Sequence, residues 1–129
     1  MISENTDVMD GNDYIAAVLK LYLELPETPL RAGPQDRGRA NEFLERRVPL
    51  TLIESAFLLG SLRRLIRSPE SPRLSPIRSL AYFIPVVEEL TANPLPDGYL
   101  EYLRHKMRRV GAQKVKGQTG AGSKNSVFS

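Results

Sequence analysis

Proline divides this sequence into segments that have the lengths of helices. Nine of the ten prolines fall in connectors or at the start of an apolar segment. A helical protein tolerates proline at those positions, because proline lacks a backbone N–H and its ring clashes inside a helix. Within the segments, apolar residues recur three and four positions apart, and no segment sustains the period of two that is typical of a strand. The sequence therefore predicts an all-α fold.

The apolar spacing predicts a compact bundle of about five helices. They are expected at residues 12–25, 36–47, 50–67, 75–90 and 98–110. A chain of 129 residues can bury a core of its own, so residues 12–110 are expected to form one helical domain. The acidic N-terminus, residues 1–11, and a basic tail rich in glycine, serine and lysine, residues 111–129, are expected to be disordered.

The segment 50–67 is apolar nearly all round, which indicates a helix buried at the centre of the bundle. Phe57 is expected in the core, and Gly60 is expected to permit the close approach of another helix. Thr51 and Glu54 have the spacing of a capping box at the start of this helix.

The ends of two other helices carry recognisable signals. Asn12 or Asp13 is the expected N-cap of the first helix. In the segment 75–90, Ser75 and Pro76 suit the start of a helix, whereas Pro85 lies inside the apolar pattern. A kink is therefore expected at Pro85.

The charge is distributed unevenly along the chain. The net charge is +3, but residues 103–129 contain seven basic residues and no acidic one, which leaves a net charge of −4 for residues 1–102. Residues 63–80 are a second basic stretch, with five arginines and one glutamate. Such a distribution suggests a polyanionic partner that approaches one side of the molecule. The alternative is a solvated surface next to a solubilising tail.

The two basic stretches supply the candidate binding residues. Arginines beside an aromatic ring suit single-stranded DNA or an RNA backbone. The short connector after residue 67 is expected to bring Arg78 near Arg67 in a compact cluster. In the alternative interpretation, the arginines at 63, 64 and 67 only complement a helix C-terminus, and Arg78 pairs with Glu54 or Glu89. The candidate nucleic-acid-binding residues are Arg63, Arg64, Arg67, Arg73, Arg78, Tyr82, Arg104, Lys106, Arg108 and Arg109.

Catalytic chemistry is not expected. The single histidine, His105, is surrounded by cations, and Ser55 and Ser61 lack the glycine frame of a nucleophile elbow. Glu88 and Glu89 are adjacent, so they point to different sides of a helix. The motif DVMDGND does not place the required acids of a calcium loop, and no cofactor fingerprint or metal-ligand spacing is present in the sequence.

The chain has no cysteine, which excludes disulfides and thiolate ligands and fits the reducing environment of the cytoplasm. No apolar run approaches the roughly 18 residues that a membrane span needs, so no membrane partner is expected.

Residues 36–67 have the outline of a helix-turn-helix. A recognition helix must present polar side chains to base edges. The third helix begins instead with Leu50, Leu52 and Ile53, which belong in a core. Reading of the major groove by this helix is therefore not favoured.

Three stretches of the sequence, RRVPLTLIESAFLLGSLRRLIR, SPIRSLAYFIPVVEEL and PDGYLEYLRHKM, resemble the helical C-terminal regions of replication-initiation proteins from plasmids, phages and mobile elements, loosely including DnaD-like domains. The resemblance spans roughly residues 40–107 and includes the aromatic pair Tyr82 and Phe83. It implies contact with single-stranded DNA or with a helicase loader through the basic end.

We therefore expect a non-enzymatic nucleic-acid-associated protein of the cytoplasm, an accessory of a mobile element. A protein–protein adaptor is the first alternative. A small homodimer that uses the exposed apolar side of the first helix is the second.

Overall fold

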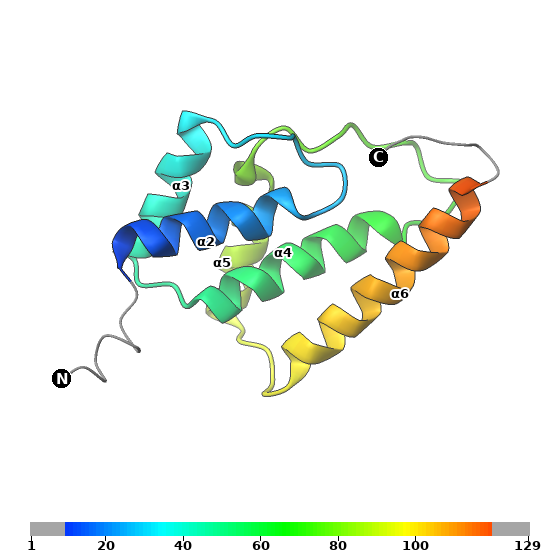
Figure 1. Cartoon of the computed structure of the whole chain (residues 1–129). Coiled ribbons are helices and arrows are strands. Elements are labelled where there is room, and N and C mark those ends of the chain that lie inside the picture. The colour runs from blue at the N-terminus through cyan, green and yellow to red at the C-terminus, as the bar shows by residue number, and fades with distance from the viewer. Residues whose placement is uncertain (1–9, 120–129) are drawn as a thin grey trace.

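The prolines and the apolar spacing produce five α-helices and one 3₁₀ turn in the structure, which is a computed structural model that describes residues 10–119, with side chains described for residues 10–110 (Figure 1). The elements are α2 (Gly11–Leu23), α3 (Pro34–Glu45), α4 (Leu50–Leu65), the 3₁₀ turn η1 (Leu80–Phe83), α5 (Ile84–Ala92) and α6 (Tyr99–Thr119). There is no strand between residues 10 and 119, so the prediction of an all-α bundle is confirmed.

Helix α4 lies at the centre of the bundle. It packs against α2, α5 and α6, which surround it on different sides (Figure 1). The Phe57 side chain is fully buried, and its ring centroid lies 5.1 Å from that of Phe83 and 6.4 Å from that of Tyr22. The prediction that the apolar segment 50–67 forms the central helix is therefore confirmed.

The small size of Gly60 is required by this packing. A Cβ at Gly60 would lie 2.8 Å from the Phe83 ring, which is closer than carbon atoms approach in folded proteins. The predicted close approach at Gly60 is confirmed, and its partner is the buried ring of Phe83 at the end of η1.

The fourth predicted helix is wrong over its first half. Residues 72–78 have no regular secondary structure, and Ser79 rather than Ser75 is the N-cap, because its hydroxyl accepts a hydrogen bond from the Ala81 N–H at 3.2 Å. The kink predicted at Pro85 is absent, because Pro85 lies in the first turn of α5. The backbone N–H groups of a first turn have no hydrogen-bond partner within the helix, so proline breaks no hydrogen bond there. The segment is therefore a 3₁₀ turn followed by a short helix.

The predicted ends of three other helices also need correction. Helix α2 begins at Gly11 with Asp10 as its N-cap, instead of Asn12 or Asp13. Thr51 forms no capping box, because α4 already begins at Leu50 after Pro49. Helix α6 continues past Gly111 to Thr119, where a disordered tail was expected. Alanine, glutamine and lysine follow Gly111, and one glycine costs a helix only about 1 kcal/mol. The remaining predicted disorder, at residues 1–9 and 120–129, lies outside the described residues.

A buried carboxylate fastens two parts of the fold together. Asp36 on α3 is only 5% exposed. Its side chain accepts hydrogen bonds from the backbone N–H groups of Gly33 and Leu80, both at 2.9 Å. Asp36 therefore caps the N-terminus of α3 and links η1 to this helix.

The connector, defined as residues 66–79 between α4 and η1, is held at a second point. The Ile77 N–H donates to the Glu27 carbonyl oxygen at 3.0 Å, and the Ile77 side chain is buried. The arginines of the connector are thus carried by an extended segment that is anchored to the loop after α2.

Candidate functional site

Arg63, the first of the candidate arginines along the chain, is bound to a glutamate. Both terminal nitrogens of Arg63 donate to the Glu89 carboxylate, at 2.9 and 2.8 Å. This hydrogen-bonded pair raises the pKa of Arg63 and lowers that of Glu89. Arg63 therefore links α4 to α5, and its charge is already compensated.

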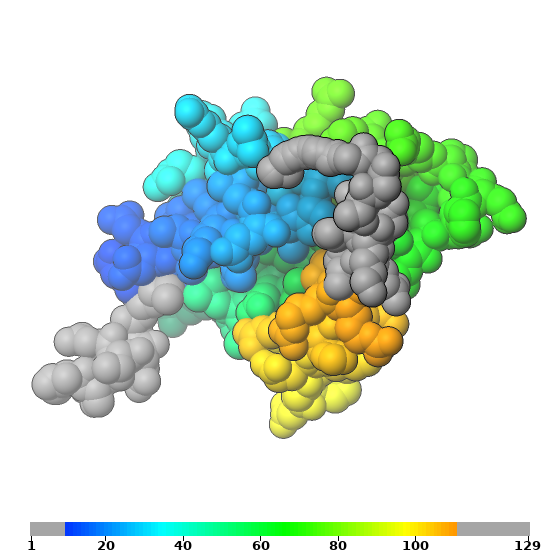
Figure 2. Space-filling view, turned by 45° about the vertical axis from the view of Figure 1, so that its right-hand side comes forward, coloured from blue at the N-terminus to red at the C-terminus, as the bar shows by residue number. Residues whose placement is uncertain are grey.

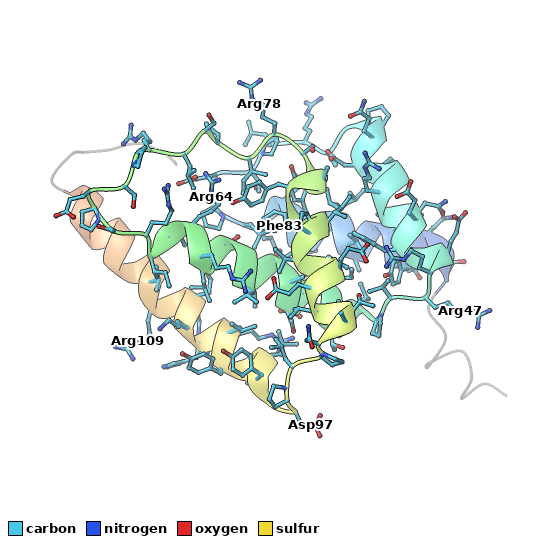
Figure 3. All side chains as sticks on the ribbon, turned by 180° about the vertical axis from the view of Figure 1, so that it is seen from behind. Arg47, Arg64, Arg78, Phe83, Asp97 and Arg109 are labelled. Carbon is cyan, nitrogen blue, oxygen red and sulfur yellow. The ribbon has the colours of Figure 1, made fainter. Side chains whose placement is uncertain are left out.

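Arg64 is nearly buried, with 7% of its side chain exposed. It forms an ion pair with Glu27 and donates to the Ser75 carbonyl oxygen at 2.8 Å. The Arg64 guanidinium carbon also lies 5.2 Å from the centroid of the Tyr82 ring. Figure 3 shows Arg64 between α4 and the connector. Its contacts hold the connector in place and leave little of its charge for a ligand.

Arg104 on α6 is the third compensated arginine among the candidates. It donates to both carboxylate oxygens of Glu54 at 2.8 Å and to Glu101 on its own helix. These hydrogen bonds raise the pKa of Arg104. Arg104 therefore joins α6 to α4, and three of the ten candidate residues have structural ion pairs.

The basic residues of the connector have no carboxylate partner among the described residues. Arg67, Arg73 and Arg78 are all exposed, and Arg67 donates only to the Pro72 carbonyl oxygen, at 2.9 Å. Arg67 and Arg73 line a polar hollow of about 290 Å³ at the end of α4, together with Arg64, its partner Glu27 and two serines.

The predicted cluster of Arg67 with Arg78 is divided in the structure. Arg78 does not line the hollow, and Figure 3 shows it pointing outward from the body of the molecule. The alternative pairing of Arg78 with Glu54 or Glu89 is not observed either, because those carboxylates bind Arg104 and Arg63.

The outer side of α6 carries the other candidate cations. Arg108 and Arg109 are exposed, and the Lys106 Nζ lies 6.0 Å from the centroid of the Tyr102 ring. A hollow of about 260 Å³ on this surface is lined by Tyr102, His105, Lys106, Arg109 and Val110. Tyr102 is not among the candidate residues predicted from the sequence, although Tyr102, Lys106 and Arg109 have the spacing of one helical face. His105 was considered there only for catalysis.

The connector and α6 reach the same end of the molecule. Helices α4 and α6 run toward a common end in Figure 1, and the connector begins there. Figure 2 brings this end forward and shows the connector, in green, and the described part of α6, in yellow and orange, on the surface. Figure 3 nevertheless shows Arg78 of the connector and Arg109 of α6 pointing away from each other, so the exposed cations of the two elements do not form a single patch.

An apolar hollow of about 360 Å³ lies between the start of α4 and the turn from α5 to α6. Its lining includes Leu52, Leu90, Leu95 and Leu100. The predicted apolar side of the first helix offers no comparable surface, because the exposed positions of α2 are polar or alanine. Between residues 10 and 110, the most exposed large apolar side chains are those of Leu30, Ile66, Leu74, Tyr82 and Tyr102.

Three of the residues weighed for catalysis have structural contacts, whereas the buried hydroxyl of a fourth, Ser61, has no hydrogen-bond partner within residues 10–110. Glu88 and Glu89 bind Arg46 and Arg63 on two neighbouring helices, and the Ser55 hydroxyl donates to the Thr51 carbonyl oxygen at 2.8 Å. Within the described part of the chain, no three acidic or histidine side chains gather as metal ligands would. None of the helices described here has the length and apolar character that a membrane crossing requires.

Comparisons with protein families, with curated proteins and with solved structures found no match to this chain.

Proposed function

We propose that this chain is a non-enzymatic nucleic-acid-associated protein that binds the phosphate backbone. The contacts would come from the exposed cations that have no carboxylate partner among the described residues. Among the candidate residues, Arg67, Arg73 and Arg78 on the connector and Arg108 and Arg109 on α6 meet this description, and the partly buried Lys106 is added to them. Arg31, Arg37 and Arg47 are also exposed without a carboxylate partner among the described residues, but they lie outside the two basic stretches. The observation that carries the proposal is that these cations have no carboxylate partner in the described part of the chain, whereas Arg63, Arg64 and Arg104 each have one.

The proposal uses only part of the basic surface that the sequence suggests. An exposed, uncompensated guanidinium can bind a phosphate without first breaking an ion pair, and it releases a condensed counterion when it does so. Arg63, Arg64 and Arg104 would have to give up a carboxylate. We therefore assign these three arginines to the fold and the other cations to the ligand.

Contacts of this kind position a protein on a nucleic acid without reading its sequence. Weak sequence preference is consistent with the start of α4, where Ile53 is buried and no polar recognition face exists. An accessory role in the replication of a mobile element, suggested by the resemblance of residues 40–107, fits such binding. A location in the cytoplasm fits this role and the cysteine-free sequence.

The test is a binding assay against single-stranded DNA, duplex DNA and RNA at increasing salt concentration. Four to six phosphate contacts to a single strand should give a slope of log affinity against log salt of about −3 to −4. Replacing Arg67, Arg73 and Arg78 together by glutamine should make the slope shallower by about two units, since each lost contact removes roughly 0.7.

A matched control replaces three arginines that are bound to carboxylates. The combined variant Arg46→Gln, Arg63→Gln and Arg104→Gln removes the same charge but should leave the slope unchanged. Equal changes in slope for the two triple variants would show that net charge, and not the proposed residues, controls binding. Absence of any salt-sensitive binding would contradict the proposal.

The second candidate function is that of a protein–protein adaptor, which the apolar hollow at the start of α4 favours. A surface of leucines and prolines between three elements suits an apolar side chain of a partner. This function would be preferred if the chain bound no nucleic acid at any salt concentration.

A further inference from the structure

We propose that α6 carries a base-stacking site, so that the nucleic acid bound by this protein is single-stranded. The site is the tyrosine strip, defined as Tyr99, Tyr102, His105, Lys106 and Arg109. This inference rests on the proposed function, because it assigns the class of nucleic acid whose phosphates the exposed cations bind.

The aromatic part of the strip consists of one partly buried ring and one exposed ring that lie side by side. The rings of Tyr99 and Tyr102 lie 5.1 Å apart between centroids, inclined at 46°. Tyr99 is partly buried and packs against the core, whereas the Tyr102 side chain is 48% exposed. The inner ring thus supports the outer one, and the outer ring offers a face to a planar ligand with little further loss of rotamer freedom.

The cations of the strip follow the ring along the helix. Lys106 is one turn beyond Tyr102 and Arg109 is about two turns beyond it, so all three lie on one face of α6. Tyr102, His105, Lys106 and Arg109 together line the hollow of about 260 Å³. The nearest acidic residue of α6, Glu101, is bound to Arg104. A phosphate next to a stacked base would therefore meet positive charge along this face.

This combination distinguishes a single strand from a duplex. A base inside a duplex has both faces covered by its neighbours, whereas an unpaired base has a free face to place on an aromatic ring. Stacking on tyrosine tolerates any base, which agrees with the absence of a sequence-reading helix. The purely structural explanation is that Tyr102 only covers the stem of Lys106, as amphipathic side chains often do.

The experiment compares two ligands of equal charge by fluorescence anisotropy of a labelled strand. One is an oligothymidylate of about twelve nucleotides, within the length that a single-strand site occupies, and the other is an abasic strand of the same length. The wild-type protein should bind the oligothymidylate about 5- to 100-fold more tightly, the range expected for one stacked base. The same gain is expected for an oligouridylate, because the base and not the sugar makes the contact.

Three variants test the strip itself. Tyr102→Leu should remove the gain over the abasic strand, and Tyr102→Phe should retain it, because both keep an apolar side chain but only phenylalanine keeps a ring. Tyr82→Leu tests the other exposed ring among the candidate residues, since Tyr82 is 42% exposed but lies on η1 outside the strip. All three should keep the helical circular dichroism of the wild type, because these side chains lie at the surface.

The outcomes separate this inference from the proposed function. Salt-sensitive binding that is equal for the abasic strand and the oligothymidylate would overturn the stacking site and leave phosphate binding intact. The stacking site would also be wrong if Tyr102→Leu kept the gain, if Tyr82→Leu removed it, or if duplex DNA bound as tightly as the single strand. No binding to any of these ligands would overturn both proposals.

Discussion

At the scale of single residues, the contact between Gly60 and Phe83 is the one that tolerates least change. A methyl group at position 60 would lie 2.8 Å from a ring that is fully buried and cannot swing away. Alanine gains about 1 kcal/mol over glycine in a helix, but overpacking a core costs about 1–3 kcal/mol. We therefore expect Gly60→Ala to lower the free energy of unfolding by up to about 2 kcal/mol, measured by urea denaturation.

A second variant tests whether the Phe83 ring is what makes a larger residue at position 60 unfavourable. In the double variant Gly60→Ala and Phe83→Leu, the methyl group no longer meets a rigid ring, so the cost of Gly60→Ala should be smaller than in the wild-type background. An equal cost in both backgrounds would show that the ring is not what constrains position 60.

Residues of the core could be predicted from the sequence, and residues with remote polar partners could not. Phe57 and Gly60 lie in a segment whose apolar pattern already marks a buried helix. Asp36 has no such signal, because its partner is the backbone N–H of Leu80, 44 positions away. The arginines show the same limit: the sequence supplies Glu54 and Glu89 as partners but does not select Arg104 and Arg63 over Arg78.

At the scale of elements, α5 is a short helix that two ion pairs fasten to its neighbours. Glu88 binds Arg46 at the end of α3, with the shortest distance 2.8 Å, and Glu89 binds Arg63 on α4 at the same distance. The hydrogen bonds to these arginines lower the pKa of both glutamates below the ordinary value of 4.5. These ion pairs link α5 to the end of α3 and to α4.

These pKa shifts predict a loss of stability in acid. A carboxyl whose pKa is lower in the folded state stabilises the protein above its unfolded pKa, and this contribution is lost as the pH falls through the folded pKa. The melting temperature, followed by circular dichroism, should therefore decrease between about pH 5 and about pH 3. In the double variant Glu88→Gln and Glu89→Gln, the decrease should be smaller, because the two titrating groups are gone.

A pH dependence identical in the wild type and the double variant would mean that the ion pairs do not hold α5 in solution. High salt offers an independent check, since both pairs are about half exposed and should be screened.

The element boundaries show where sequence periodicity is insufficient. Residues 75–90 have the apolar spacing of one helix, yet Pro85 divides them into a 3₁₀ turn and α5. A helix cannot continue through a proline without losing a backbone hydrogen bond. The residues before η1 are not helical, and the Ile77 N–H instead donates to the Glu27 carbonyl oxygen. In this segment the apolar periodicity predicts which side chains are buried, whereas the position of the proline determines where the α-helix begins.

At the scale of the whole molecule, composition predicted the architecture but only half of the candidate site. The helical period and the prolines were sufficient for an all-α bundle around α4. The uneven charge marks two basic stretches of the sequence, but which of their cations lack an ion pair depends on which carboxylates the fold brings close. Tyr102 was not predicted as a site residue, although it lies one turn before Lys106 on α6.

The attachment of α6 to a single neighbour has a consequence for motion. Helix α6 packs chiefly on α4, through Leu103 and a few partly buried side chains, whereas α4 is enclosed by three helices. Local opening requires only that the contacts of one element be broken, so α6 should detach at a lower free energy than the whole molecule unfolds. Amide hydrogen exchange should therefore be faster along α6 than along α4. Equal protection in both helices, with the same dependence on denaturant, would instead show one cooperative unit. If this result is found, α6 opens independently of the other helices, and the tyrosine strip lies on the part of the molecule that moves.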